Sequence, residues 1–194
     1  PDVGGVCGLL FENSSLRATC HDLYERGDIL IRDIRAKNAK FVAGAPFIEF
    51  DFLNNVAVFR RECVEEYHWD PKLQQGKPHL DFYVGHFRQT DWRFGICPEV
   101  QFLHNPGGST SYQSNRNSRR RITEAREYFM KKWGYRQIVF GQLEWLETHN
   151  QVPDGRSSFQ SLLKALIYQL PIGTQARIMD LRLAIRRLRG DPPL

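Results

Sequence analysis

The 194-residue chain lacks any apolar run close to the roughly 20 residues that cross a bilayer as a helix. Its first residues, PDVGGVCGLLFENSS, lack the basic start and long apolar core of a signal peptide. Cysteine is scarce, and no two of Cys7, Cys20, Cys63 and Cys97 have the C-x2-C spacing of a zinc site. We therefore expect neither a disulfide scaffold nor a zinc finger, and we expect the cysteines to be small buried apolar residues.

Several catalytic motifs are also missing. The chain has no G-x-S-x-G elbow for a serine hydrolase, no Walker-type phosphate loop and no G-x-G-x-x-G pattern. Cys20 and His21 are adjacent, but nothing around them indicates a stabilised thiolate, and we interpret the pair as incidental. The sequence thus gives no support to these common classes of hydrolase and nucleotide-binding enzyme.

The composition is that of a folded domain with uneven charge. Apolar residues make up 41% and charged residues 25%, and the net charge is +5. Residues 116–136 contain eight Arg or Lys and two Glu, and residues 177–189 contain five Arg and one Asp. Such clusters attract phosphate, anionic lipid or nucleic acid, or they form a solvated helix face. The aromatic residues near 118–136 fall on the apolar face, so we do not predict nucleic-acid binding.

Local patterns predict a mixed α/β fold with a sheet and flanking helices. Runs rich in β-branched and aromatic residues predict strands within 2–11, 28–36, 39–52 and 91–105. A further strand is expected to pass into a short helix near Arg60. Helices are expected from about Pro78 and over 118–133, the second with Ile122, Ala125, Phe129 and Trp133 on one face and Gly134 as its stop.

The character of the chain changes near residue 149. A linker-like NQVPDGRSS precedes an apolar helix over 159–170 and a basic amphipathic helix over 174–190. Two interpretations stay open: an interfacial membrane helix, or a helix packed against its own domain or a partner. We therefore expect a domain over 1–148 and an amphipathic helical tail over 149–194.

Three residues could serve chemistry or bind a metal. Imidazole and carboxylate together suit Mn, Zn or Fe, which draws attention to His79, Asp81 and His104. On a regular helix His79 and Asp81 point away from each other, so one of them serves a site more easily than both. His104 ends a predicted strand before a glycine-rich loop, a position from which a side chain can reach a ligand.

Six phrases stand in order along the chain: FVAGAPFIEFDFLNNVAVFRRECVEE, WDPKL, HLDFYVGHF, WRFGICPEVQFLHN, YQSNR and YFMKKWG. In this order they resemble the second half of a family-2-type glycosyltransferase of GT-A fold, in its β-1,4-N-acetylgalactosaminyltransferase-like branch. The resemblance covers roughly residues 1–136. It implies the second half of a GT-A-type fold and an inverting transfer of sugar from a nucleotide sugar, most simply a UDP-sugar, to a hydroxyl acceptor.

The resemblance implies roles for particular residues. Asp81 in HLDF matches the acidic residue that acts as catalytic base, and His104 matches a histidine that holds metal and diphosphate. Arg116 in YQSNR matches a basic position that meets diphosphate, and Lys132, Trp133 and Gly134 match the closing phrase. The expected acceptor-binding residues are Asn54, Asn55, Tyr83 and Trp92. A base that takes the acceptor proton and cationic help for the departing diphosphate are what such a transfer needs.

The resemblance also implies partners. The complete enzyme is expected to use a divalent metal, Mn or Mg, and to act on a glycan or lipid-linked acceptor. A peripheral membrane contact is expected through 159–189, on the cytoplasmic face in a bacterium or in the Golgi lumen in a eukaryote. Residues 82, 83, 87 and 92 are aromatic and could stack on sugars, but we expect Phe82 and Phe87 to be core residues.

One departure from the family pattern is large. No D-x-D motif precedes Asp81 in a suitable context, and the chain starts at Pro1 rather than Met. We expect a piece of a longer enzyme, or a half-domain that needs a partner chain, with little or no transfer by this chain alone. Two other classes stay open: a non-catalytic glycan- or lipid-binding module, and a metal-dependent hydrolase built on His79, Asp81 and His104.

Overall fold

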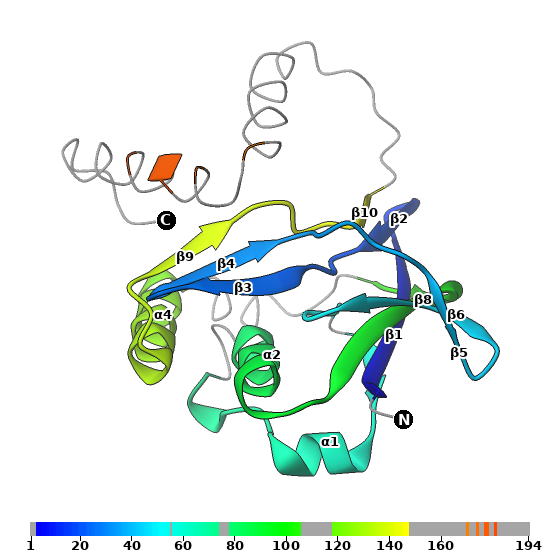
Figure 1. The fold of residues 1–194 in the computed structure, drawn as a ribbon, viewed down its shortest axis with the longest axis horizontal. Helices are drawn as coiled ribbons and strands as arrows, with labels where there is room; N and C mark the ends of the chain where they lie inside the picture. Colours follow the sequence, from blue (N-terminus) through cyan, green and yellow to red (C-terminus); the bar gives the residue numbers. More distant parts are fainter. Residues whose placement is uncertain are drawn as a thin grey trace. The chain divides into compact units, whose positions relative to one another are not determined.

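The computed structural model of the chain describes residues 3–54, 56–73, 78–105 and 118–147, with five isolated positions between 170 and 181. The chain divides into two compact units, Pro1–His149 and Asn150–Leu194. All helices and strands given below belong to the first unit. That unit is mixed α/β with two mixed sheets, which confirms the predicted fold class at this level (Figure 1).

The first sheet has seven strands in the order β10-β2-β1-β8-β6-β5, with β7 paired to β1. The strands are β1 (Val3–Glu12), β2 (Ser15–Ala18), β5 (Lys40–Val42), β6 (Ala45–Phe50), β7 (Ala57–Phe59), β8 (Arg93–Leu103) and β10 (Leu146–Glu147). β1 and β8 are parallel, and the other pairs are antiparallel. The carboxyl ends of β1 and β8 therefore lie side by side.

The second sheet has three strands, β3 (Asp22–Arg26), β4 (Ile29–Asp33) and β9 (Gln137–Phe140), in the order β3-β4-β9. β3 and β4 form a hairpin whose turn places Gly27 at a φ of 57°, a left-handed conformation that glycine adopts without strain. An antiparallel bridge between His21 and Phe52 connects the start of this sheet to the residues that follow β6. The strands within 2–11 and 28–36 were predicted; β2, β3, β9 and β10 were not.

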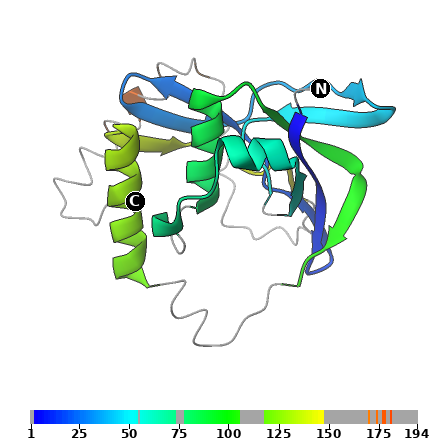
Figure 2. The same cartoon turned by 90° about the horizontal axis from the view of Figure 1, so that it is seen from below.

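The helices are α1 (Arg61–Glu66), α2 (Pro78–Gln89) and α4 (Arg119–Trp133), with a 3-10 turn, η1 (Pro71–Leu73). The predicted starts near Arg60 and Pro78 are confirmed. Gly134 caps α4 in the left-handed region, at a φ of 72°, and donates its backbone N–H to the carbonyl of Met130, so the predicted stop is confirmed. Figures 1 and 2 both show α2 and α4 side by side.

One hydrophobic core joins both sheets to α2 and α4. At its centre Phe82 stacks on Trp69, with ring centroids 4.1 Å apart, and meets the edges of Phe59 and Phe94. The prediction of a core role is confirmed for Phe82, which is fully buried. It is wrong for Phe87, which is 38% exposed. No helix among the residues that the structure describes is long and apolar enough to cross a membrane.

Two histidines, His21 and His86, are buried beside this core. His21 accepts a hydrogen bond at Nε2 from Arg32 Nε at 2.9 Å, and burial, followed by the charge of Arg32, lowers its pKa to about 2. His86 lies 2.9 Å through Nδ1 from the Thr90 hydroxyl, and burial lowers its pKa to about 4. Both imidazoles are therefore neutral in the folded protein at neutral pH.

We expect the free energy of unfolding to fall as the pH is lowered from about 6.5, the value of an unperturbed histidine. Both folded pKa values lie below it, so the unfolded state binds more protons in this window. The stabilisation from keeping the two histidines neutral is fully present above about pH 6.5. The part due to His86 is lost as the pH falls to about 4, and the part due to His21 continues to fall to about pH 2. The steepest loss is up to about 1.4 kcal/mol per pH unit for each histidine.

Urea unfolding at several pH values between about 7 and 4.5 measures this dependence. Replacing His86 by Gln removes one titrating group and is expected to flatten the profile. Replacing the exposed His68 by Gln is the matched control and is expected to leave the slope unchanged. A free energy of unfolding that does not change between about pH 6.5 and 5 would show that neither histidine is held neutral by the fold.

Candidate functional site

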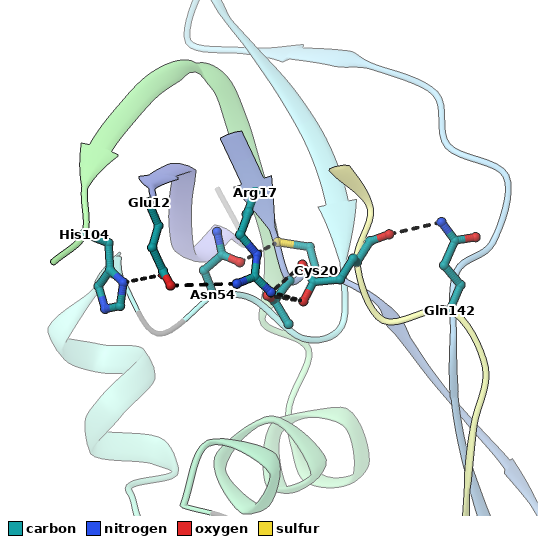
Figure 3. Close-up of polar contacts among 8 residues, drawn as sticks. Glu12, Arg17, Cys20, Asn54, His104 and Gln142 are labelled. Atoms are coloured by element: carbon teal, nitrogen blue, oxygen red, sulfur yellow. Dashed lines mark hydrogen bonds and ion pairs between the residues drawn. The ribbon is translucent and has the colours of Figure 1, made fainter. Parts of the chain in front are cut away.

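Five polar side chains gather where β1 and β8 end (Figure 3). This strand-end cluster consists of Glu12, Arg17, Thr19, His104 and Glu144. Glu12 is the last residue of β1, and His104 follows the last residue of β8. Because these strands are adjacent and parallel, their carboxyl ends meet, which is where ligands bind in many open α/β sheets.

Glu12 fixes the ring of His104. The imidazole Nδ1 lies 2.7 Å from the carboxylate Oε2 of Glu12, and the His104 backbone N–H donates to the carbonyl of Phe11 at 2.9 Å. With Nδ1 directed at the carboxylate, Nε2 is the ring atom left for a ligand. The His104 side chain is 41% exposed, so a ligand can reach it.

Arg17 and Thr19 connect the cluster to the segment between β9 and β10. The Arg17 guanidinium lies 3.1 Å from Glu144 Oε1 and 3.8 Å from Glu12 Oε1. The Thr19 hydroxyl lies 2.9 Å from both carboxylate oxygens of Glu144. Two carboxylates and one guanidinium leave one net negative charge when His104 is neutral. The described cluster therefore suits a cation or sugar hydroxyls better than a bare diphosphate.

Asp81 lies in the first turn of α2 and is fully buried. Its Oδ1 accepts a hydrogen bond from Trp133 Nε1 at 2.8 Å. Its Oδ2 accepts one from Lys132 Nζ at 2.9 Å and one from the Tyr67 hydroxyl at 3.2 Å. Three donors from two other segments thus surround the carboxylate, and one of them is a cation.

Lys132 joins Asp81 to a second carboxylate nearer the surface. Its ammonium lies 2.9 Å from Asp70 Oδ2, which also accepts from the Tyr128 hydroxyl at 2.9 Å. Desolvation works against charge on Asp70, but hydrogen bonds from Lys132, the Lys72 backbone and Tyr128 lower its pKa to about 2. Desolvation likewise disfavours the Lys132 charge, but the hydrogen bonds of both carboxylates raise its pKa well above the ordinary value.

The Asp81 network (Tyr67, Asp70, Asp81, Tyr128, Lys132 and Trp133) unites three of the phrases noted in the sequence. WDPKL supplies Asp70, HLDF supplies Asp81, and YFMKKWG supplies Lys132 and Trp133. Sequence reasoning noted these phrases separately and did not predict that they meet. Tyr128 is the first residue of YFMKKWG, but no role was predicted for it. Tyr67 lies outside the quoted phrases, and only its closeness to WDPKL along the chain could have pointed to it.

The predicted acceptor-binding residues lie in different surroundings. Asn54 is buried, donates from Nδ2 to the Gly8 carbonyl at 3.0 Å and accepts from the Cys20 thiol at 3.9 Å. Tyr83 is buried in the aromatic core against Phe94, where it offers no face to a sugar. Trp92 is half-buried, and its Nε1 donates to Glu66 at 2.6 Å. We therefore do not propose acceptor contacts for Asn54 or Tyr83 in this conformation.

Two predicted site residues, Asn55 and Arg116, lie outside the described residues, as does most of the predicted membrane-contact segment 159–189. Within the described ranges no three His, Cys, Asp or Glu side chains converge where they could hold a metal ion. His104 and Asp81 belong to separate networks, so a hydrolase centre built from both with His79 gains no support. A divalent metal at His104 would need ligands beyond these residues.

Comparisons with known proteins gave no relative. No family model, no curated protein and no solved structure matches the chain. What bears on function is therefore the set of motifs in the chain and the contacts that bring those motifs together.

Proposed function

We propose that the first unit is the acceptor-side part of an inverting glycosyltransferase that moves a sugar from a UDP-sugar to a hydroxyl of a glycan or lipid-linked acceptor. The observation that carries this proposal is the meeting of three phrases around the Asp81 carboxylate. Asp70 and Lys132 are 62 positions apart in the sequence, yet they share one network with Asp81. The same three phrases are among the six on which the resemblance to the family depends.

An ion pair with a fully buried carboxylate is a poor way to stabilise a domain, because desolvation of that charge offsets much of the attraction. An apolar pair of similar volume at Asp81 and Lys132 would serve packing as well or better. Buried charges with specific partners occur often at functional sites, where chemistry requires them. The burial of Asp81 among three donors therefore supports a chemical role more than a purely structural one.

In the proposed reaction Asp81 accepts the proton of the acceptor hydroxyl as that oxygen attacks the anomeric carbon of the donor. A carboxylate has about four acceptor sites, and the donors at Asp81 use three of them, so Oδ1 keeps one. The carboxylate is closed to solvent in this structure. The reaction therefore requires an opening beside it, and Tyr67, which makes the longest of the three hydrogen bonds, is the side chain we expect to move.

The donor side of the proposed site is the strand-end cluster. His104, held by Glu12, presents its free ring edge toward the donor, and Arg116 assists the leaving diphosphate. Because the two carboxylates of the described cluster outnumber its one guanidinium, neutralisation of the diphosphate depends on groups outside the described residues. We propose that a region with a D-x-D motif and a bound Mn or Mg, elsewhere in the natural protein or on a partner chain, completes the site.

A transfer assay on the full natural protein tests the proposal. Purified protein is incubated with a panel of UDP-sugars, glycan acceptors and Mn²⁺ or Mg²⁺, and released UDP and glycosylated product are measured. We expect turnover with one donor and a loss of about 100-fold when His104 is replaced by Ala, the scale of losing one polar group at a reacting centre. The exposed His68, replaced by Ala, is the matched control and is expected to keep full turnover.

Two outcomes would overturn the proposal. One is the absence of turnover with every UDP-sugar by a folded protein that binds glycan, which would instead support a non-catalytic binding module. The other is a His104→Ala variant whose turnover stays within about threefold of wild type, because the donor side would then lie elsewhere.

A further inference from the structure

We infer that Cys7 and Cys20 form a disulfide-bond site, a cross-link between β1 and the segment that follows β2, and that this cross-link holds the strand-end cluster in place. Their Sγ atoms are 3.7 Å apart, and both side chains are buried. The formation of the bond does not depend on the proposed function. Only its effect on turnover rests on that function.

The β1–β2 hairpin brings the two cysteines near each other. In this hairpin Leu10 pairs with Arg17, Phe11 with Leu16 and Glu12 with Ser15. Beyond these pairs Cys7 is paired with Ala57 of β7, and Cys20 follows the last residue of β2 by two positions. A disulfide holds its two Sγ atoms about 2.0 Å apart, so a small shift of the two side chains is enough to close the 3.7 Å contact.

The two sulfurs have no competing partner among the described cysteines. Cys63 contacts His86 Nε2 at 3.6 Å, and Cys97 is the only cysteine that is not fully buried. Burial raises the pKa of the Cys20 thiol well above the ordinary value, and the adjacent Cys7 raises it further. In the folded, reduced protein this makes Cys20 a poor nucleophile. The bond therefore forms while the hairpin is still assembling.

The reaction is a thiol–disulfide exchange with a low-molecular-weight disulfide such as oxidised glutathione. The Cys7 thiolate attacks one sulfur of the oxidant, which gives a mixed disulfide and releases one glutathione thiolate. The Cys20 thiolate then attacks the Cys7 sulfur, the Cys7–Cys20 bond forms, and the second glutathione leaves. Two electrons pass from the protein to the oxidant, and the two thiol protons end on the two glutathione molecules.

The ring closed by this bond carries three members of the strand-end cluster. Glu12, Arg17 and Thr19 all lie between Cys7 and Cys20, so the cross-link limits how far the hairpin can open around them. Asn54 Oδ1 accepts a weak hydrogen bond from the Cys20 thiol at 3.9 Å, which is lost when the thiol is oxidised. The hydrogen bond that Asn54 Nδ2 donates to the Gly8 carbonyl at 3.0 Å is unaffected. Oxidation thus stiffens the site without removing its principal contacts.

The test is refolding of the full chain from denaturant in a glutathione redox buffer, followed by alkylation of all free thiols under denaturing conditions. The chain has four cysteines, and we expect two of them, Cys63 and Cys97, to be alkylated. Peptide mapping without reduction is expected to find Cys7 joined to Cys20. The oxidised protein is expected to melt roughly 5 °C or more above the reduced protein.

Variants sharpen the result. Cys7→Ser and Cys20→Ser are each expected to leave three alkylated thiols, and Cys97→Ser, the matched control, is expected to leave one. Four free thiols in the refolded wild-type monomer, or a bond that includes Cys63 or Cys97, would overturn the inference, and this measurement needs no variant to fold. In the transfer assay, reduction of the Cys7–Cys20 bond is expected to lower turnover about two- to tenfold. If the oxidised and reduced proteins turn over equally, the effect of the bond on the site is rejected, while the bond itself stays established by the peptide map.

Discussion

Replacing Asp81 by Asn is expected to lower the turnover of sugar transfer by at least about 100-fold and to leave the affinity for the UDP-sugar within about threefold. Asn has the shape of Asp and can still accept from Trp133 Nε1, which lies 2.8 Å from Oδ1. It cannot take a proton from the acceptor hydroxyl. Donor binding is proposed to depend on the strand-end cluster, a separate network, so it is expected to persist.

Asp70→Asn is the matched control for this variant. Asp70 and Asp81 each lie 2.9 Å from the same ammonium group of Lys132, so both substitutions remove one carboxylate from one lysine. Only Asp81 is proposed to meet the acceptor, and Asp70→Asn is expected to keep turnover within about tenfold of wild type. Turnover is measured below the melting temperature of each variant, so that loss of folded protein does not imitate loss of chemistry. An Asp81→Asn enzyme that keeps more than a tenth of wild-type turnover would end the assignment of the base.

Replacing Lys132 by Met is expected to lower the free energy of unfolding by about 3 kcal/mol, the lower end of the effect of breaking a buried ion pair. Asp81 is fully buried, and without Lys132 its carboxylate keeps two neutral donors and no cation. The lysine itself is 25% exposed, and water can replace part of its contribution. This solvation keeps the expected loss at the lower end of the range.

Lys131→Met is the control, since the neighbouring residue in the same helix is exposed, and the change is expected to alter stability by less than about 0.5 kcal/mol. Urea unfolding of Lys132→Met, Asp81→Asn and the double variant completes a double-mutant cycle. We expect a coupling energy of roughly 2 kcal/mol, because the double variant no longer buries an uncompensated charge. Additive effects of the two substitutions would mean that the ion pair contributes nothing to the fold.

The elements with strong local signals were predictable from the sequence. Pro78 and Gly134 mark the start of α2 and the end of α4 by backbone preferences that act within a turn. β3 and β9 escaped prediction because DLYER and QIVF are short, and the pairing that stabilises each is with β4 rather than within its own segment. Long-range pairing is what a local pattern does not contain.

The same limit applies to the candidate site. Sequence reasoning singled out Asp81 and His104 from residue type and position, but it did not find Glu12 as the partner of His104. Glu12 and His104 are 92 residues apart, and nothing local to ENSS distinguishes this glutamate from a surface residue. Only the parallel pairing of β1 with β8 brings the two side chains together. The burial of Tyr83 was not predicted either, because local amphipathicity did not show how deeply this part of α2 lies in the core.

The parallel pairing of β1 with β8 also has a consequence for biosynthesis. Val3 pairs with Arg93, and about 90 residues must leave the ribosome before β1 can meet this partner, which takes roughly 5–20 s at ordinary rates of translation. Until then one hydrogen-bonding side of β1 is open, in a segment as apolar as VGGVCGLLF. Such an unpaired strand is prone to aggregate, so the nascent chain is expected to depend on chaperones in this interval.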